Sequence, residues 1–389
     1  MITLPPDVGG VTTMARAFGR VLQSAGYAVT AAHRATYSDA PKLSVPIWAA
    51  PFRRPMMEVF RDDRVGLPRY GVGTWLPELE WTHYLPWQPW HNLIGRFAHH
   101  VVVTGNGLSA SGLAKLGLPA LNWIATSYLA DRTDRFRTKP LARRLFDRVL
   151  NRPVCERVER FVLEKTHVLA LSDYTARELK AVTPAVNLAG VLRMPIELTA
   201  ARPRPAPRRS PLVIGFAGRL TDPRKNIGLL FDAFRLLRGK IAAELHLVGD
   251  LTPEWAQQLG AGDLLDGIRF LPVRPATEMA GFYQGLDIFV IPSRQEGLAI
   301  VGLEAMAQGL PVVSTRCGGP EDYVLPNDTG YLTGFDAGEM ADAVLAATGD
   351  DAQYARLSAN ALSFVQNHHG FETFKDAVMT HFRTVYLGN

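Results

Sequence analysis

The sequence predicts an α/β fold with two domains, each a parallel sheet with crossover helices. The chain has 389 residues, enough for two domains of ordinary size that each bury a core. Short apolar runs alternate with helical patterns in both halves. Residues 201–210 are rich in proline and arginine and form the predicted linker. We therefore expect an N-terminal domain over residues 1–200 and a C-terminal domain over residues 211–370.

The first half begins with a short apolar strand at residues 1–4, followed by a loop and a helix to about residue 25. The loop contains Gly9 and Gly10, which permit close backbone approach, although two glycines are also common in ordinary turns. Further apolar runs of strand length follow later in this half. They occupy residues 101–104, 120–125 and 167–172.

The second half repeats the alternation more regularly. An amphipathic helix is predicted over residues 227–238, and a last helix over residues 371–386. Apolar runs between such segments are typical of buried parallel strands. The predicted strands lie near residues 212–217, 244–248, 268–271, 287–292 and 311–314.

The most informative segment follows the predicted strand at 287–292. A loop over residues 293–297 leads into a helix of small and unbranched residues over 300–308, which Gly309 ends. Between Glu296 and Arg316 the only formal charge is that of Glu304. A lone carboxylate in so apolar a segment costs several kcal/mol, roughly, unless a partner binds it, and we expect that partner to be a ligand. Glu296 lies where ligands bind in open α/β sheets, at the carboxyl end of a strand.

A second cluster follows the predicted strand at 212–217. Gly218 permits close backbone approach to an anion, and the cations Arg219 and Lys225 come within the next seven positions. A helix begins directly after Asn226. In isolation this loop is equally typical of a solvated basic turn. Together with the Glu pair it indicates a site for a ligand with both phosphate and hydroxyl groups.

Both segments resemble the donor site of retaining glycosyltransferases of family 4, which have the GT-B fold of two Rossmann-like domains facing across a cleft. One match is Gly-Arg-Leu with Lys-Asn at 218–226. The other is Pro-Ser, Glu-Gly and Leu-Glu-Ala-Met-Ala with Gly-Leu-Pro-Val-Val at 292–313. The resemblance is specific over about 213–332 and general in the first half. It also implies that the helix in 371–389 crosses back to the N-terminal domain.

The resemblance assigns roles residue by residue. Arg219 and Lys225 would clamp the diphosphate, Glu296 would contact hydroxyls of the donor sugar, and Glu304 would hold the ribose diol. With them, the helix N-terminus after Glu296 would stabilise the departing phosphate. The other expected donor-binding residues are Gly9, Gly10, Gly218, Asn226, Val273, Gly297, Leu298, Ala299 and Ile300.

The first half departs from the family pattern. A histidine often ends the strand that aligns with residues 120–125, whereas this chain has Thr126 directly after it. Thr126, or Asn106 in the preceding loop, is our candidate for a hydrogen bond to the sugar. The usual Asn-Gly-Val-Asp is replaced by Met-Pro-Ile-Glu at 194–197.

Composition narrows the class of protein. The sequence has no Asp-x-Asp and no Cys/His cluster with ligand spacing, so we expect no metal and no cofactor. Two cysteines, Cys155 and Cys317, favour a reducing cytoplasm over a disulfide framework. We find no secretion signal and no apolar run of membrane-spanning length. No motif indicates nucleic-acid binding.

Two segments of the first half leave alternatives open. Residues 131–165 carry eleven Lys/Arg and six Asp/Glu, so 11 − 6 = +5, the net charge of the whole chain. The helical pattern at 141–150 within them has an apolar face with cations opposite. Such a helix can lie on anionic lipid, or it can be an ordinary solvated helix, which we prefer from the sequence.

Residues 75–91 contain four tryptophans among prolines that disfavour a regular element. These rings form a local core, our preference, or bind a sugar or a membrane surface.

The sequence therefore predicts a cytoplasmic glycosyltransferase, with peripheral membrane contact left open. It would move a hexose or hexosamine from a UDP- or GDP-sugar to a hydroxyl of a glycan, lipid-linked or small-molecule acceptor, without a metal. Two alternatives are a nucleotide-sugar epimerase of the same fold and a non-catalytic subunit that binds a sugar nucleotide.

Overall fold

The computed structural model describes residues 1–4, 10–37, 40–60, 67–137, 139–198, 201–207 and 210–388. The chain forms two compact units. Unit 1 comprises Met1–Met194 and Glu372–Asn389, and unit 2 comprises Pro195–Phe371. The division lies before the predicted linker rather than within it. Arg204 of that segment belongs to unit 2, where its guanidinium donates to the carbonyls of Tyr283 (3.0 Å) and Gln308 (3.2 Å).

Unit 1 contains an eight-stranded sheet in the order β3-β4-β2-β1-β5-β6-β7-β8. Its strand pairs are parallel except β3–β4, which is antiparallel. The centre is buried, as expected for a parallel sheet. The strands are β1 (Ile2–Leu4), β2 (Ala31–Ala35), β3 (Met57–Phe60), β4 (Arg69–Gly73), β5 (Val101–Thr104), β6 (Leu121–Ile124), β7 (His167–Ala170) and β8 (Leu188–Val191).

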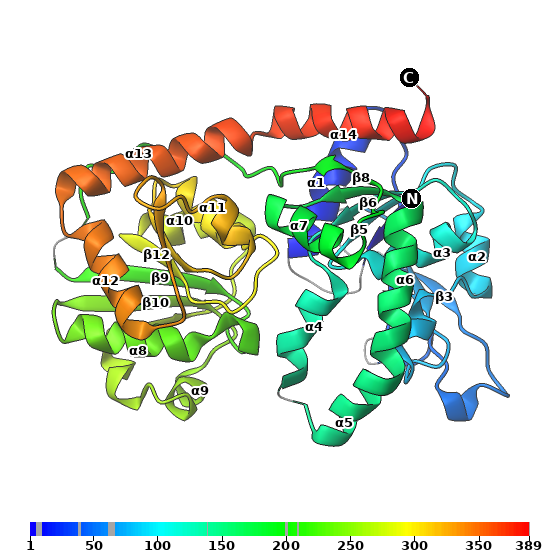
Figure 1. Cartoon of the computed structure of the whole chain (residues 1–389), viewed down its shortest axis with the longest axis horizontal. Helices are drawn as coiled ribbons and strands as arrows, with labels where there is room; N and C mark the ends of the chain where they lie inside the picture. The colour runs from blue at the N-terminus through cyan, green and yellow to red at the C-terminus, as the bar shows by residue number, and fades with distance from the viewer. Residues whose placement is uncertain are drawn as a thin grey trace. The chain divides into compact units, whose positions relative to one another are not determined.

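Helices connect these strands (Figure 1). The α-helices of unit 1 are α1 (Gly10–Ser24), α2 (Gln88–Ile94), α3 (Ser111–Lys115), α4 (Tyr128–Arg137), α5 (Leu141–Phe146), α6 (Arg152–Lys165), α7 (Asp173–Val182) and α14 (Phe371–Tyr386). A π-helical turn, η4 (Asp147–Asn151), joins α5 to α6. The 3₁₀ turns are η1 (Ile47–Ala49), η2 (Glu80–Tyr84) and η3 (Gly107–Ala110).

Unit 2 contains a six-stranded parallel sheet in the order β11-β10-β9-β12-β13-β14. The strands are β9 (Leu212–Gly218), β10 (Ala243–Gly249), β11 (Ile268–Leu271), β12 (Ile288–Ile291), β13 (Val312–Thr315) and β14 (Gly330–Thr333). The helices are α8 (Ile227–Arg238), α9 (Pro253–Gln258), α10 (Ala276–Gln284), α11 (Ile300–Met306), α12 (Ala337–Thr348) and α13 (Asp351–His368), with 3₁₀ turns η5 (Pro223–Lys225), η6 (Gly262–Gly267) and η7 (Gly319–Asp322). Helix α8 and the pair α10 and α11 lie on opposite sides of the strands (Figure 1).

The structure confirms the strands predicted for the second half and the helix at 227–238. The prediction that residues 75–91 lack a regular element was wrong. Helix α2 begins at Gln88, and Pro89 occupies its first turn, where a missing N–H breaks no helical hydrogen bond. The tryptophans form a local core, as preferred from sequence. Trp90 is buried, and the rings of Trp75 and Trp87 pack with centroids 5.7 Å apart.

A buried carboxyl supports the loops at the carboxyl edge of the unit 1 sheet. Glu159 of α6 accepts a hydrogen bond from the backbone N–H of Tyr128 at 2.8 Å, and one from the N–H of Gly107. These two residues begin α4 and η3, the elements that follow β6 and β5. Burial raises the pKa of Glu159 to about 7, although both N–H groups oppose the shift.

We predict a pH-dependent stability term from Glu159. Between the ordinary pKa of a glutamate, about 4.5, and about 7, the folded state binds the proton more strongly than the unfolded state. Stability must therefore fall as pH rises through this window, by on the order of 2 kcal/mol. Glu159→Gln should remove that slope in unfolding experiments at pH 5 and pH 8. Glu164→Gln, an exposed change on the same helix, should keep the wild-type slope, and equal slopes in all three proteins would contradict the assignment.

Candidate active site

The first part of the candidate site is the turn after β9. The strand ends at Gly218, whose φ of 155° favours glycine. Asp222 then caps η5 by accepting from the N–H of Arg224 at 3.1 Å, and it pairs with the Arg224 side chain at 2.8 Å. Although burial opposes the shift, this bonding lowers the pKa of Asp222 to about 2. Arg219 is less engaged, because its guanidinium lies 3.7 Å from Asp222 and its side chain is 54% exposed.

The second part is a contact between the two sequence motifs. The Lys225 Nζ lies 2.6 Å from Oε1 of Glu296, and both side chains are largely buried. Ser293 donates to the same oxygen at 2.6 Å. Among the described residues, both hydrogen bonds to this carboxylate end on Oε1, so Oε2 is available to a ligand. The structure thus brings together two of the three predicted catalytic residues, 71 positions apart in sequence.

The loop that carries Glu296 is held by its backbone. The N–H of Glu296 donates to the carbonyl of Cys317 at 2.7 Å, and its carbonyl accepts from Gly319 at 2.9 Å. The close approach requires glycine at 319, since a Cβ there would lie 2.3 Å from the carbonyl oxygen of Gly297. Asn226 anchors the neighbouring strand end, because its side-chain amide donates to the carbonyl of Pro292 at 3.1 Å. Asn226 therefore has a supporting role in this structure.

Glu304 has a protein partner that the sequence interpretation missed. The Tyr283 hydroxyl, on α10, donates to Oε2 of Glu304 at 2.6 Å. Burial raises the pKa of Glu304, and the Tyr283 hydrogen bond opposes that shift. The expectation that a lone carboxylate here needs a ligand was thus incomplete, since Tyr283 supplies one hydrogen bond. Oε1 is the oxygen that the described residues leave for a ligand.

The helix that follows Glu296 is shorter than predicted. Helix α11 spans seven residues and ends at Met306, whereas the sequence predicted a helix to residue 308. Ala299 has a φ of 56°, and its carbonyl accepts from the Tyr323 hydroxyl at 2.9 Å and from the N–H of Gly302 at 2.9 Å. A helix this short has a weak dipole.

The remaining predicted residues occupy separate places. Val273 is exposed just after β11 in unit 2. In unit 1, Gly10 begins α1, and Gly9 lies outside the described residues. Asn106 and Thr126 follow the neighbouring strands β5 and β6, at one edge of the sheet, with Thr126 donating its N–H to Gly105 at 2.7 Å. The Asn106 side chain accepts from the N–H of Leu108 at 3.3 Å, which makes it a cap of η3.

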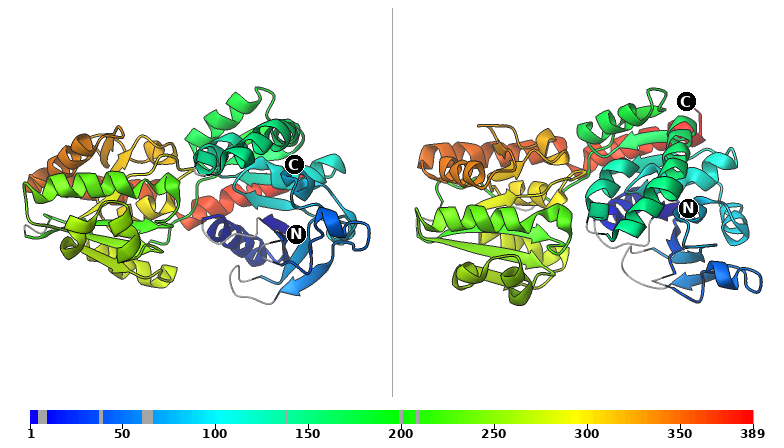
Figure 2. Two further views of the ribbon diagram at one scale, coloured as in Figure 1. Left: turned by 90° about the horizontal axis from the view of Figure 1, so that it is seen from below. Right: turned by 60° about the horizontal axis from the view of Figure 1, so that its bottom comes forward.

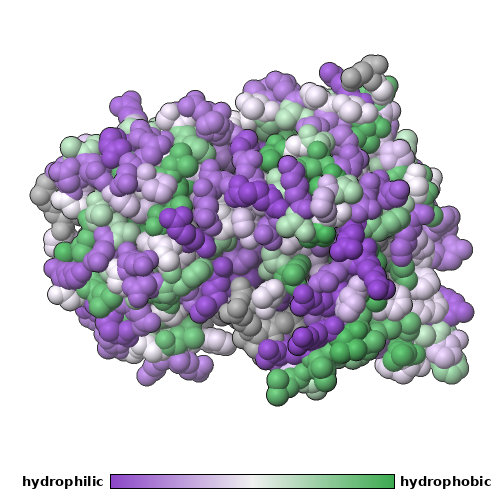
Figure 3. Space-filling view, viewed as in Figure 1, coloured by the Kyte–Doolittle hydropathy of each residue, from purple (hydrophilic) through white to green (hydrophobic). Residues whose placement is uncertain are grey.

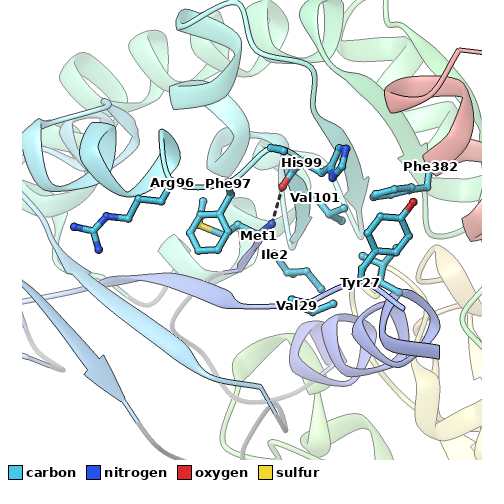
Figure 4. A pocket seen from close by; sticks show the side chains of 12 residues that line it. Met1, Ile2, Tyr27, Val29, Arg96, Phe97, His99, Val101 and Phe382 are labelled. Carbon is cyan, nitrogen blue, oxygen red and sulfur yellow. Dashed lines mark hydrogen bonds between the residues drawn. The ribbon is translucent and has the colours of Figure 1, made fainter. Parts of the chain in front are cut away.

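Figure 4 shows a pocket in unit 1. Met1, Tyr27, Val29, Phe97 and Val101 are among its lining residues, and they lie at the starts of β1, β2 and β5 or just before them. Ligands of open α/β sheets bind at the carboxyl edge, so this pocket at the amino edge is not our candidate site. Among the residues that the structure describes, no three His, Cys, Asp or Glu side chains gather as metal ligands would.

Comparison with solved structures defines the class of fold. The chain superposes on sucrose-phosphate synthase from Thermosynechococcus elongatus with a TM-score of 0.73 and 21% identity, covering 100% of this chain and 99% of that one. It superposes on WaaG, a glycosyltransferase involved in lipopolysaccharide biosynthesis, with a TM-score of 0.64 and 15% identity, covering 99% of both chains. The two parallel-sheet units are those of a GT-B protein.

Sequence comparison finds a similarity in the second half of the chain. Residues 211–350 match the family model described as glycosyl transferases group 1. A D-inositol 3-phosphate glycosyltransferase from Stackebrandtia nassauensis is 34% identical over 43% of this chain and 41% of its own length. One from Segniliparus rotundus is 26% identical over 98% of this chain and 86% of its own length. Several matches at higher identity thus span less than half of the relatives' length.

We predict that the Lys225–Glu296 pair stabilises unit 2. Lys225→Met leaves a buried carboxylate with one hydroxyl partner, and Glu296→Gln leaves a buried ammonium, so each should cost about 1–3 kcal/mol in urea unfolding. The double variant should cost less than the sum, with a coupling energy of at least about 1 kcal/mol. The exposed pair Lys240–Asp342, N···O 2.9 Å, is the matched control and should couple by less than about 0.5 kcal/mol. Additive losses at Lys225 and Glu296 would show that the contact contributes nothing.

Proposed function

We propose that this protein is a retaining, metal-independent glycosyltransferase that moves a hexose or hexosamine from a nucleotide diphosphate sugar to a hydroxyl. The observation that carries the proposal is the buried Lys225–Glu296 contact after β9 and β12. These strands are neighbours in the sheet, so their carboxyl ends meet at one edge. The contact joins a cation suited to phosphate with a carboxylate suited to sugar hydroxyls.

The phosphates are assigned to Arg219 and Lys225. Arg219 is exposed and only loosely paired, so it can turn toward an anion at small cost. Lys225 keeps its contact with Glu296 and offers its remaining N–H bonds to a phosphate oxygen. Arg224 is excluded from this role because Asp222 already neutralises it. Two cations stabilise the charge that builds up as the nucleotide diphosphate departs.

The two carboxylates are assigned to hydroxyl groups. Oε2 of Glu296 would accept from a hydroxyl of the transferred sugar, while Lys225 and Ser293 hold Oε1 in place. Oε1 of Glu304 would accept from the ribose diol, while Tyr283 holds Oε2. Each carboxylate thus has one oxygen fixed by the protein and the other presented to the donor, which is the preorganisation that catalysis and binding require.

The proposed chemistry uses the donor's own leaving group. The bond between the anomeric carbon and the phosphate oxygen breaks as the acceptor oxygen attacks from the same face, and the acceptor proton passes to the departing phosphate oxygen. Three structures of HepE from Anabaena, 14–16% identical to this chain, are described as complexes with UDP and glucose, with UDP, and with UDP-glucose. They support a nucleotide-sugar donor, and we propose a UDP- or GDP-sugar.

The acceptor side is proposed for unit 1, with Asn106 and Thr126 as contacts to the donor sugar or acceptor. Their strands end side by side at the carboxyl edge of the sheet. The curated relatives are named for D-inositol 3-phosphate, a small molecule with several hydroxyls. A small phosphorylated polyol is therefore the first member of an acceptor panel that also holds glycans and lipid-linked sugars.

The site assignment predicts the effect of two substitutions on transfer. Lys225→Ala and Glu296→Ala should each lower kcat/KM at least about a hundredfold, since each removes a group that contacts the reacting part of the donor. The measurement is release of nucleotide diphosphate with acceptor present, and NMR of the product should show the donor's anomeric configuration. Lys240→Ala, an exposed cation of unit 2, should leave the rate unchanged. Near-wild-type rates in either site variant would remove the assignment.

The same assay separates the alternatives. An epimerase would interconvert the donor sugar without acceptor, and a binding subunit would bind donor with no turnover on any acceptor.

The role of Tyr283 predicts a change in nucleotide affinity. Tyr283→Phe removes the hydrogen bond that opposes the raised pKa of Glu304, so a larger fraction of that carboxyl is protonated at a given pH. The Kd for UDP or GDP, whichever binds, should rise about three- to tenfold by calorimetry. The loss should be larger at pH 6 than at pH 8, because protonation removes an acceptor for the ribose diol. Tyr331→Phe, which removes a half-buried hydroxyl that accepts from Gln353 in the same unit, is the control. A loss that does not vary with pH would indicate packing alone.

A further inference from the structure

An apolar surface on unit 1 has no covering element among the described residues. Leu141, Leu145 and Val149 recur every four positions along α5 and η4, so they share one face. Leu141 is 78% exposed and Leu145 is 63% exposed. Figure 3 shows a continuous apolar strip along the lower edge of this unit, over α5. Helices normally bury such a face, so its exposure needs an explanation.

A second apolar group lies at the same end of unit 1. The segment around η1 exposes Ile47, Trp48, Phe52 and Met56, with Trp48 69% and Phe52 86% exposed. Figure 1 places this segment and α5 at the lower end of the unit, and both face the viewer when the molecule is seen from below (Figure 2). We call the two groups together the α5–η1 surface, defined by Ile47, Trp48, Phe52, Met56, Leu141, Leu145 and Val149.

Polar contacts tie the two groups to a common support. Arg132 of α4 pairs with Glu80 of η2 and with Asp147 of η4, the latter at 2.9 Å through Nε. The N–H of Glu80 donates to Asn151 at 3.0 Å, which adds a second link between η2 and η4. On the other side, the N–H of Ile47 donates to Glu78 at 3.1 Å. The apolar groups therefore sit on a shared, hydrogen-bonded framework instead of on independent loops.

The charge around this surface is positive. Exposed cations flank the apolar side chains in both groups, namely Lys42, Arg53, Arg54, Lys139, Arg143, Arg144 and Arg148. Of the acidic groups nearby, Asp147 pairs with Arg132 and Glu78 binds a backbone N–H, while Glu58 is exposed. Exposed Trp, Phe and Leu beside Arg and Lys are the composition of surfaces that lie in the headgroup region of a bilayer.

We propose that the α5–η1 surface docks this protein on an anionic lipid bilayer as a peripheral protein. A bilayer fits both observations at once, because its acyl boundary takes the apolar side chains while its phosphates take the cations. A second copy of this chain would place the same cations against each other, which like-charge repulsion disfavours. In the part of the chain that the structure describes, no helix is long and apolar enough to cross a membrane.

The test is co-sedimentation of the full chain with vesicles of phosphatidylcholine alone or with added phosphatidylglycerol. The wild-type protein should bind the mixed vesicles at least fivefold more strongly than the neutral ones, and less strongly as salt rises. Leu141→Ser/Leu145→Ser, Trp48→Ser/Phe52→Ser and Arg144→Glu/Arg148→Glu should each weaken binding at least fivefold. All six positions are exposed, so these variants should unfold at the wild-type temperature.

Matched controls keep the test specific. Trp255→Ser/Leu259→Ser removes exposed apolar side chains at α9 of unit 2, and Arg383→Glu reverses an exposed charge on α14, at the opposite end of unit 1. Both should bind like the wild type. The proposal is overturned if the wild-type chain ignores anionic vesicles or if surface variants bind as well as the controls. It is also overturned if sedimentation shows a dimer that the surface variants dissolve, since the occupant would then be a second copy.

Discussion

The candidate site of unit 2 depends on one charge contact, between Lys225 and Glu296. The pair fastens the turn after β9 to the loop after β12, where Lys225 ends the three-residue turn η5 and Glu296 lies outside any helix or strand. Both charges are largely removed from water, so each is costly without the other. Contacts of the surrounding residues also hold these two segments together. Asn226 donates to the carbonyl of Pro292 just after β12, and Gly319 lets the segment after β13 pack closely on the loop that carries Glu296.

Each of the two carboxylates has one oxygen bonded within the protein and one oxygen without a bond to the described residues. A free lysine and a free glutamate in a half-buried turn would each relax toward solvent or toward the nearest partner. Here the pairing, with Ser293, holds one carboxylate oxygen and leaves the second unused among the described residues. Glu304 follows the same rule with Tyr283. Because the protein already fixes both carboxylates, the proposed donor would lose little free energy to side-chain ordering on binding them.

The sequence predicted unit 2 well because its pattern is local. Buried parallel strands appear as apolar runs, and the residues at their carboxyl ends must share an edge, so Lys225 and Glu296 could be placed together before their contact was known. Tyr283 was missed for a different reason. A hydroxyl that bonds a carboxylate 21 residues away leaves no periodicity, and Tyr283 has the appearance of a core aromatic on α10. The length of α11 was also overestimated, since Ala307 and Gln308 are good helix formers that the turn at Gly309 overrides.

Unit 1 was harder to predict because its polar contacts are buried and long-range. The pattern at 141–150 indicated an amphipathic helix but could not tell which neighbour, if any, would cover its apolar face. In the structure, Arg132 forms ion pairs with Glu80 of η2 and with Asp147 of η4, beside this helix. Arg132 and Asp147 line the same hollow as Leu141 and Leu145, so an apolar segment packed over these leucines would also remove the ion pair from water. The ion pair thus disfavours an apolar covering element at this end of unit 1, and Leu141 and Leu145 stay exposed.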